Sequence, residues 1–256
     1  MGLDPSTPIS EVISACPCCR TPGSLVPFEL TYDIDNELTR LTLCQSCLAL
    51  FNLNAYAELK QSKPEQIQVG DFYAANGFGG DDHLAAIKNT GDTLIDYFLR
   101  RTGVDPAART FCEIGAGRGY AALAAARRFK SAYALDFDLR NVERVCQEVG
   151  RPANLHIGRS LEYVNSRIDI LMGWHVLEHI PEPLAFIEQA RTRMAPRGYF
   201  FFQVPMYRPA YLVRSHHVFY NETAMGRLMI KAGADVIEIG FDPKAGFLTA
   251  IAQLRS

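Results

Sequence analysis

The sequence predicts an α/β protein in which a seven-stranded, doubly wound sheet follows a small cysteine-rich module. Three observations predict this class. After residue 106, short apolar runs rich in β-forming residues alternate with amphipathic segments, a pattern typical of parallel strands joined by helical crossovers. Glycines crowd the turn after the first of these runs, and five of the seven cysteines lie before residue 48.

The elements follow one another in a regular order. Apolar residues recur at helical spacing over 84–102, and Gly103 and Pro106 then end the predicted helix. Strands are predicted at 110–114, 132–136, 153–157, 167–172, 199–204, 235–241 and 247–254, with helices at 120–128, 139–149, 183–194 and 222–232. Only DPKAG joins the last two strands, and this connection is too short for a parallel crossover, so the last strand should be antiparallel.

Composition excludes several classes of partner. The 256 residues carry 26 Lys and Arg against 28 Asp and Glu, so a nucleic-acid partner is not expected. The longest apolar runs are far shorter than the roughly 20 residues that span a bilayer, so no membrane partner is expected. The start, MGLDPSTPIS, lacks the basic and apolar regions of a secretory signal, which predicts a cytoplasmic location.

The early cysteines form two C-x2-C pairs, Cys16 with Cys19 and Cys44 with Cys47. Two such turns can present four thiolates to one tetrahedral zinc ion, although Cys18 could replace a neighbour as a ligand. The intervening segment FELTYDIDNELTRLTL predicts a hairpin with an Asp-Asn turn, which gives a zinc-ribbon layout. Four cysteines close the metal shell, so we expect the zinc to be structural rather than catalytic.

The glycine-rich turn CEIGAGRGY carries Glu113, Gly115, Gly117 and Gly119. Glycines allow a tight turn and let a ligand approach the start of the following helix. A dinucleotide fingerprint would require a glycine where Tyr120 stands, which argues against an NAD oxidoreductase. Asp136 ends the second strand and can accept hydrogen bonds from both hydroxyls of a ribose, so the pattern suits an adenosine-containing ligand.

These residues resemble the first motif, E-x-G-x-G-x-G, of class I S-adenosylmethionine-dependent methyltransferases. The resemblance covers 109–256 and includes three further segments that occur in the small-molecule enzymes of that family: IDILMGWHVLEHIPEP with its LEH-type sequence, the PRGY turn, and SHHVFYNETAMGRLMIKAGA. A zinc-ribbon-like start joined to this core also resembles a group of bacterial methyltransferases that includes sugar C-methyltransferases. The resemblance implies a Rossmann-like sheet and three parts: a zinc module at 1–60, a lid loop and helix at 61–108, and the methyltransferase domain at 109–256.

The resemblance also implies the site residues. The cofactor would contact Glu113, Gly115, Ala116, Gly117, Gly119, Asp136, Phe137, Ser160, Trp174 and His175. Asp136 would hold the ribose and Phe137 would lie along the adenine. Ser160 stands where the family commonly has an acidic residue, so the adenine end departs from the family pattern. From the positions of the histidines after predicted strand ends, we expect His175 or His217 to act as the base, and Glu178 and His179 to brace the loop.

The function implied is methyl transfer from S-adenosylmethionine to an oxygen, nitrogen or carbon atom of a small molecule in biosynthesis. Two alternatives stay open: methylation of RNA or protein, and a cofactor-binding scaffold that does not catalyse. The glycine-rich loop at 70–82 and the helix after it are expected to cover the site or to form a homodimer contact.

Overall fold

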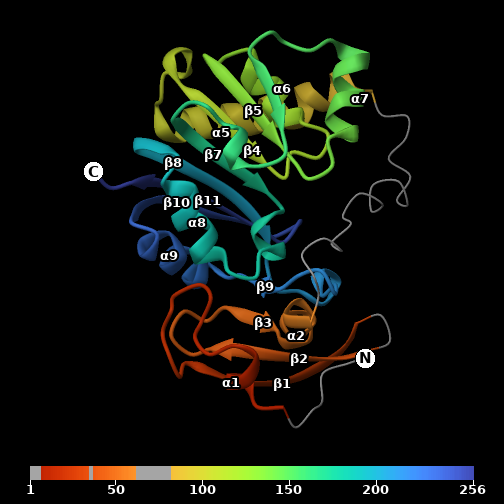
Figure 1. The fold of residues 1–256 in the computed structure, drawn as a ribbon, viewed down its shortest axis with the longest axis vertical. Helices are drawn as coiled ribbons and strands as arrows, with labels where there is room; N and C mark the ends of the chain where they lie inside the picture. Colours follow the sequence, from red (N-terminus) through yellow and green to blue (C-terminus); the bar gives the residue numbers. More distant parts are fainter. Residues whose placement is uncertain (1–6, 35–36, 62–81) are drawn as a thin grey trace. The chain divides into compact units, whose positions relative to one another are not determined.

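The computed structural model describes residues 7–34, 37–61 and 82–256 (Figure 1). These residues fall into two compact units. The first unit contains the described part of Met1–Gln66 together with His175–Arg191 and Phe202–Ala252. The second contains the described part of Ile67–Trp174 together with Thr192–Phe201 and Gln253–Ser256.

A four-stranded antiparallel sheet organises the first unit. Its N-terminal elements are α1 (Ile9–Val12), β1 (Leu25–Ile34), β2 (Glu37–Cys44), β3 (Leu50–Asn52) and α2 (Leu53–Gln61). β1 pairs with β2, which confirms the predicted hairpin, while its Asp-Asn turn lies outside the described residues. β3 pairs in turn with β9 (Val218–Phe219), so this sheet joins residues far apart in the sequence.

Apolar side chains from the N-terminal strands and from the segment around β9 form a core in this unit. Leu41, Leu50, Leu212 and Phe219 are buried together, and Phe28 packs against them. The unit also contains a 3-10 helix at Leu177–His179, α8 (Pro183–Arg191) and α9 (Glu222–Lys231). The helix predicted at 183–194 ends three residues early, at Arg191, and the next strand, β8 (Met194–Pro205), begins three residues later.

Four parallel strands form the centre of the second unit: β4 (Thr110–Ile114), β5 (Ser131–Leu135), β6 (Leu155–Gly158) and β7 (Ile168–Trp174). β4 lies between β5 and β7, and β6 pairs with β5. Every residue of β4 is buried, as expected for a strand covered on both faces. Because the strands are parallel, their carboxyl ends lie along one edge of the sheet.

The complete sheet has the order β10-β11-β8-β7-β4-β5-β6. Its remaining strands are β8 (Met194–Pro205), β10 (Ala234–Asp242) and β11 (Phe247–Leu254), and its helices include α6 (Tyr120–Ala126) and α7 (Arg140–Val149). The seven strands, the helical crossovers and the antiparallel end confirm the predicted Rossmann-like fold class.

The helix predicted at 84–102 is present but changes its winding in the middle. It consists of α4 (His83–Ala86), a π-helical stretch at Ile87–Asp92, and α5 (Thr93–Thr102). Gly91 lies against the start of α6, where a Cβ atom would come within 2.2 Å of the Tyr120 carbonyl oxygen. The predicted lid loop lies outside the described residues, apart from Asp82. Among the helices of the described ranges, none combines the length and the apolarity that crossing a membrane requires.

Candidate metal, cofactor and catalytic sites

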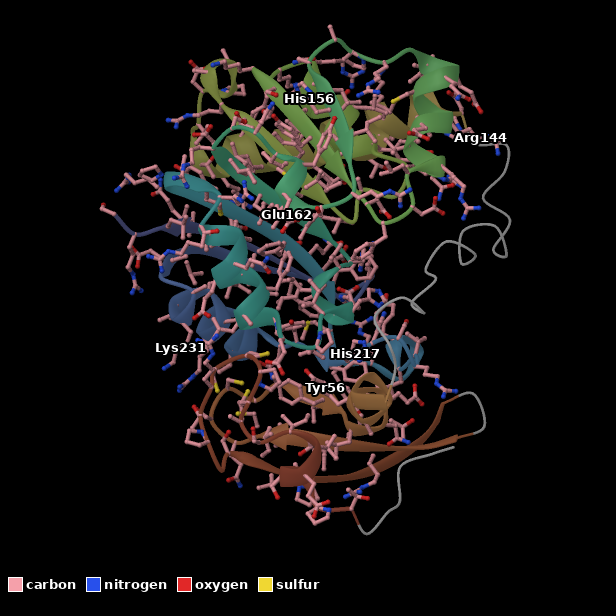
Figure 2. The ribbon with its side chains drawn as sticks, in the orientation of Figure 1. Tyr56, Arg144, His156, Glu162, His217 and Lys231 are labelled. Atoms are coloured by element: carbon pink, nitrogen blue, oxygen red, sulfur yellow. The ribbon has the colours of Figure 1, made fainter. Side chains whose placement is uncertain are left out.

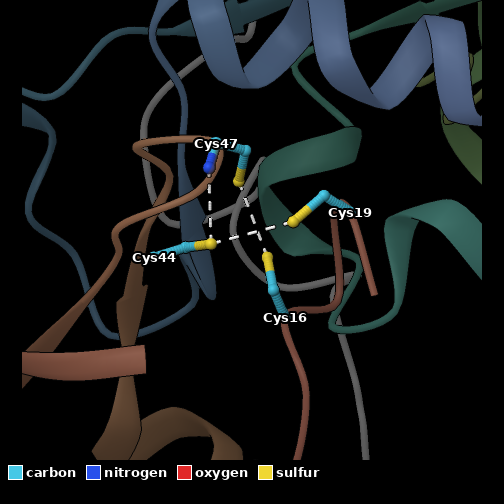
Figure 3. A group of neighbouring side chains, drawn as sticks. All are labelled: Cys16, Cys19, Cys44 and Cys47. Carbon is cyan, nitrogen blue, oxygen red and sulfur yellow. Dashed lines mark hydrogen bonds between the residues drawn. The ribbon is translucent and has the colours of Figure 1, made fainter. Parts of the chain in front are cut away.

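Cys16, Cys19, Cys44 and Cys47 bring their four sulfur atoms within 4.8 Å of one another (Figure 3). Both C-x2-C turns have the same backbone geometry. The N–H of Arg20 donates to the Cys16 carbonyl at 2.7 Å, and the N–H of Leu48 donates to the Cys44 carbonyl at 2.8 Å. Arg20 and Leu48 both have positive φ angles, 55° and 65°, so each turn closes in the left-handed region. Two equivalent turns therefore aim two sulfurs each at a common centre.

The sulfur separations suit a tetrahedral ion. Sγ of Cys16 lies 3.6 Å from Sγ of Cys47, and Sγ of Cys19 lies 3.7 Å from Sγ of Cys44. A tetrahedron with Zn–S bonds of about 2.3 Å has edges of about 3.8 Å, whereas a disulfide bond is only about 2.0 Å long. All seven cysteines are free thiols, and Cys18 is buried outside the group of four. The four cysteines therefore fit a structural zinc site.

The protonation of these thiols competes with metal binding. A hydrogen bond to Cys16 and burial raise the pKa of Cys47. Four thiolates at this spacing repel one another unless a cation neutralises them. Bound metal would replace the protons, so we expect its affinity to fall as the pH falls.

The turn between β4 and α6 depends on three glycines with left-handed backbone. The φ angles of Gly115, Gly117 and Gly119 are 60°, 52° and 71°. Space is short at Gly119, where a Cβ atom would lie 2.6 Å from Cγ2 of Val142. Only glycine meets both requirements at this position. The first backbone N–H groups of α6 have no acceptor within the helix itself.

Glu113 secures this turn from the strand side. Its side chain is buried, and Oε2 accepts a hydrogen bond of 2.9 Å from the N–H of Ala122 in the first turn of α6. Burial raises the pKa of Glu113 to about 8. A buried carboxyl group therefore holds the helix end against β4.

Asp136 secures the same turn from the next strand. Its Oδ2 accepts from the N–H of Gly117 at 2.8 Å, and its Oδ1 accepts from the N–H of Asp138 at 2.9 Å. The sequence indicated a ribose contact here but not this link to the glycine turn. Each carboxylate oxygen keeps a lone pair beyond these bonds.

The other predicted cofactor contacts of this unit also follow strand ends. Ala116 is buried, and its N–H donates to the Leu135 carbonyl at 3.0 Å. Phe137 is 77% exposed directly after β5, and Ser160 is exposed after β6. Trp174 ends β7 and meets the Phe201 ring edge to face. Nine of the ten predicted cofactor residues thus lie in the second unit, and His175 lies in the first.

The two candidate bases have different surroundings within the first unit. Nδ1 of His175 lies 3.5 Å from Oε1 of Glu178, a carboxylate that is only 1% exposed. His217 instead meets the ring of Tyr56 at a centroid distance of 5.8 Å (Figure 2), and its buried Nδ1 lacks a hydrogen-bond partner among the described residues. Burial lowers the pKa of His217 to about 4.

Comparison with known proteins identifies the family. A family model described as a methyltransferase domain matches residues 88–239, more than half of the chain. Two mycobacterial proteins, each named "uncharacterized methyltransferase", are 29% and 27% identical over 101 and 100 residues. These matches cover 39% of this chain and 40% of each relative, so the match spans less than half of the curated relatives.

Solved structures share the fold. A S-adenosylmethionine-dependent methyltransferase from Aquifex aeolicus gives a TM-score of 0.53 at 16% identity, over 68% of this chain and all of the other. Magnesium protoporphyrin IX methyltransferase from Synechocystis, solved with bound S-adenosylhomocysteine, gives 0.52 at 16% identity, over 68% of this chain and 86% of the other. Together with the match of the family model, the sheet order and the glycine turn establish that this chain belongs to the methyltransferase domain family.

Proposed function

We propose that the protein transfers a methyl group from S-adenosylmethionine to a small-molecule acceptor. The supporting observation is the hydrogen-bonded turn after β4, in which Glu113 holds the start of α6 and Asp136 holds Gly117. This turn lies at the carboxyl ends of parallel strands, where open α/β sheets bind their ligands. The proposal agrees with the family of the chain.

S-adenosylmethionine supplies a methyl group on a positively charged sulfur, and the acceptor displaces that sulfur in line. The protein must therefore align the two molecules and exclude water. Asp136 would bind the ribose hydroxyls through its remaining lone pairs, and the exposed ring of Phe137 would pack on the adenine. Ser160 and Trp174 would complete the contacts at the ends of β6 and β7.

Of the two histidines, His175 is the better candidate for the base. Its ring lies beside the buried carboxylate of Glu178, which can orient the ring and stabilise its protonated form. His217 has a pKa lowered to about 4 by burial, far below the value that suits proton transfer at neutral pH. We therefore assign proton abstraction to His175 and a packing role to His217.

The zinc ion would be structural, since four cysteine ligands leave no open position. We also propose that the chain divides into a zinc module at 1–60, a lid and helix at 61–108 and a methyltransferase domain at 109–256. The near-balanced charge of -2 favours a small acceptor over RNA.

Transfer of a radiolabelled methyl group tests the proposal. The acceptors would be separate panels of small hydroxyl, amine and carbon-acid compounds, with RNA and a protein mixture alongside. We expect label in a small-molecule panel only. We further expect His175→Gln to lower kcat by about 100-fold or more while His217→Gln has a much smaller effect. Label in RNA or protein would refute the acceptor class, and equal effects of both substitutions would refute the assignment of the base.

A further inference from the structure

A second group of metal-ligating side chains lies in the first unit, apart from the cysteines. Glu178 and His179 belong to the 3-10 helix Leu177–His179, and His216 precedes β9. One potential ligand atom from each residue lies within 4.8 Å of the others. The rings of His179 and His216 have a centroid distance of 4.8 Å, and Nε2 of His179 lies 4.0 Å from Oε1 of Glu178.

The hydrogen bonds of both histidines leave the same nitrogen available. Nδ1 of His179 lies 3.0 Å from the Ser215 carbonyl oxygen, and Nδ1 of His216 lies 2.8 Å from the Tyr211 carbonyl oxygen. A carbonyl oxygen only accepts, so each Nδ1 carries the proton and each Nε2 keeps its lone pair. Histidines that bind metals in proteins are commonly held in this way by a backbone carbonyl.

Glu178 supplies an independent indication of a ligand. Its side chain is 1% exposed, and Oε2 is a buried oxygen with no hydrogen-bond partner among the described residues. A carboxylate oxygen buried without a partner is unfavourable, and buried charges are normally paired or bound to a metal ion. Oε1 of the same carboxylate lies 3.5 Å from Nδ1 of His175 and 4.0 Å from Nε2 of His179, so an ion bound beside His179 would also neutralise this buried charge.

From these contacts we infer that Glu178, His179 and His216 form a second metal site, which takes a divalent first-row transition ion. Two imidazoles and one carboxylate suit zinc, iron, cobalt or manganese better than calcium, which prefers oxygen ligands alone. Three protein ligands leave at least one position open for water or for an oxygen donor. This site differs from the cysteine site both in its ligands and in its open shell.

Cobalt binding to protein that already holds one zinc ion in its cysteine site tests the inference. Cobalt(II) bound by thiolates gives a strong thiolate-to-metal absorption, whereas a site of imidazoles and a carboxylate gives only weak visible bands. We expect one additional cobalt ion per chain, without the thiolate absorption. His179→Asn should weaken this binding by about 100-fold or more, and Glu178→Gln and His216→Asn should do the same.

Controls separate loss of the site from loss of the fold. The side chain of His179 is 43% exposed, so His179→Asn should leave the protein folded, with zinc still bound at the cysteines. His156, which stacks on Tyr133 and is labelled in Figure 2, lies outside the group, and His156→Gln should bind cobalt as the wild type does. The inference is wrong if the zinc-loaded wild type takes up no cobalt, or if His179→Asn binds cobalt as tightly as His156→Gln.

Discussion

In the turn between β4 and α6, Gly119 is required both by its backbone conformation and by the lack of space for a side chain. Its φ angle of 71° excludes most side chains, and Val142 fills the space that a Cβ atom would need. Gly103 shares the left-handed backbone, at 65°, but a Cβ atom there would meet nothing within 4 Å. The pair therefore separates the cost of backbone strain from the cost of the clash.

We predict that Gly119→Ala lowers the free energy of unfolding by about 2–4 kcal/mol, because strain and overpacking add. The matched control Gly103→Ala should cost about 1 kcal/mol, since only the strain remains. Urea denaturation of both variants measures the difference. Equal losses would mean that Val142 moves aside and that the turn is not tightly packed.

Glu113 should make stability depend on pH. Its pKa is raised from 4.5 to about 8 in the folded protein, so folding favours the protonated form. Stability from this group is complete below pH 4.5 and is lost as the pH rises through about 8. Without ligand, Glu113→Gln should remove this decline, because the amide oxygen can still accept from Ala122 and carries no charge.

Urea denaturation at several pH values between 5 and 9, with exposed Glu162→Gln as the control, measures this effect. Glu162 has a lowered pKa because of its hydrogen bond to Ser160, so it stays ionised across this range and its substitution should leave the pH dependence intact. An unchanged pH dependence in Glu113→Gln would contradict the burial of a carboxyl group at this position.

At the residue scale, the sequence predicted the strand-turn-helix around the glycines but not the hydrogen bonds within it. The motif predicted Glu113, the glycines and Asp136, since spacing along the chain determines a strand-turn-helix. It did not reveal that Asp136 also accepts from Gly117, nor that His179 and His216 lie together. Those contacts depend on how distant segments pack, and the only signal in the sequence was the number of histidines after predicted strands.

At the scale of elements, the spacing of the cysteines predicted their two turns and the hairpin between them. It did not predict that β3 and β9 would extend this hairpin to a four-stranded sheet. β3 has three residues and pairs with β9, which has two, and such short strands have no periodicity to detect. Further hydrogen bonds connect the two cysteine turns to later segments of the first unit. The N–H of Leu184 donates to the Pro17 carbonyl, and the Asn221 amide donates to the Leu48 carbonyl.

We predict that Cys16→Ser abolishes zinc binding and that Cys18→Ser retains one zinc ion per chain. Loss of zinc should release β1 to β3, and also β9, because β9 pairs with β3. Elemental analysis together with hydrogen exchange measures both effects. Backbone amides of β4, β5 and β6 should keep their protection, which provides the internal control. Zinc retained in Cys16→Ser but lost in Cys18→Ser would show that Cys18 is the ligand.

At the scale of the whole molecule, alternation of strands and helices predicted the sheet well. Parallel strands covered on both faces leave continuous apolar runs, and a short connection marks the antiparallel end. The end of α8 was predicted three residues too late, and the π-helical stretch that contains Gly91 was not predicted. At this scale, we propose that the carboxyl edge of the sheet binds S-adenosylmethionine.

Calorimetric titration with S-adenosylhomocysteine, with NAD as the competing ligand, tests that claim most directly. We expect micromolar binding of S-adenosylhomocysteine and no binding of NAD. Asp136→Asn should weaken binding about 100-fold, because it loses charged hydrogen bonds to the ribose, whereas its neighbour Asp138→Asn should bind normally. Binding of NAD alone, or equal affinities in both variants, would contradict the account.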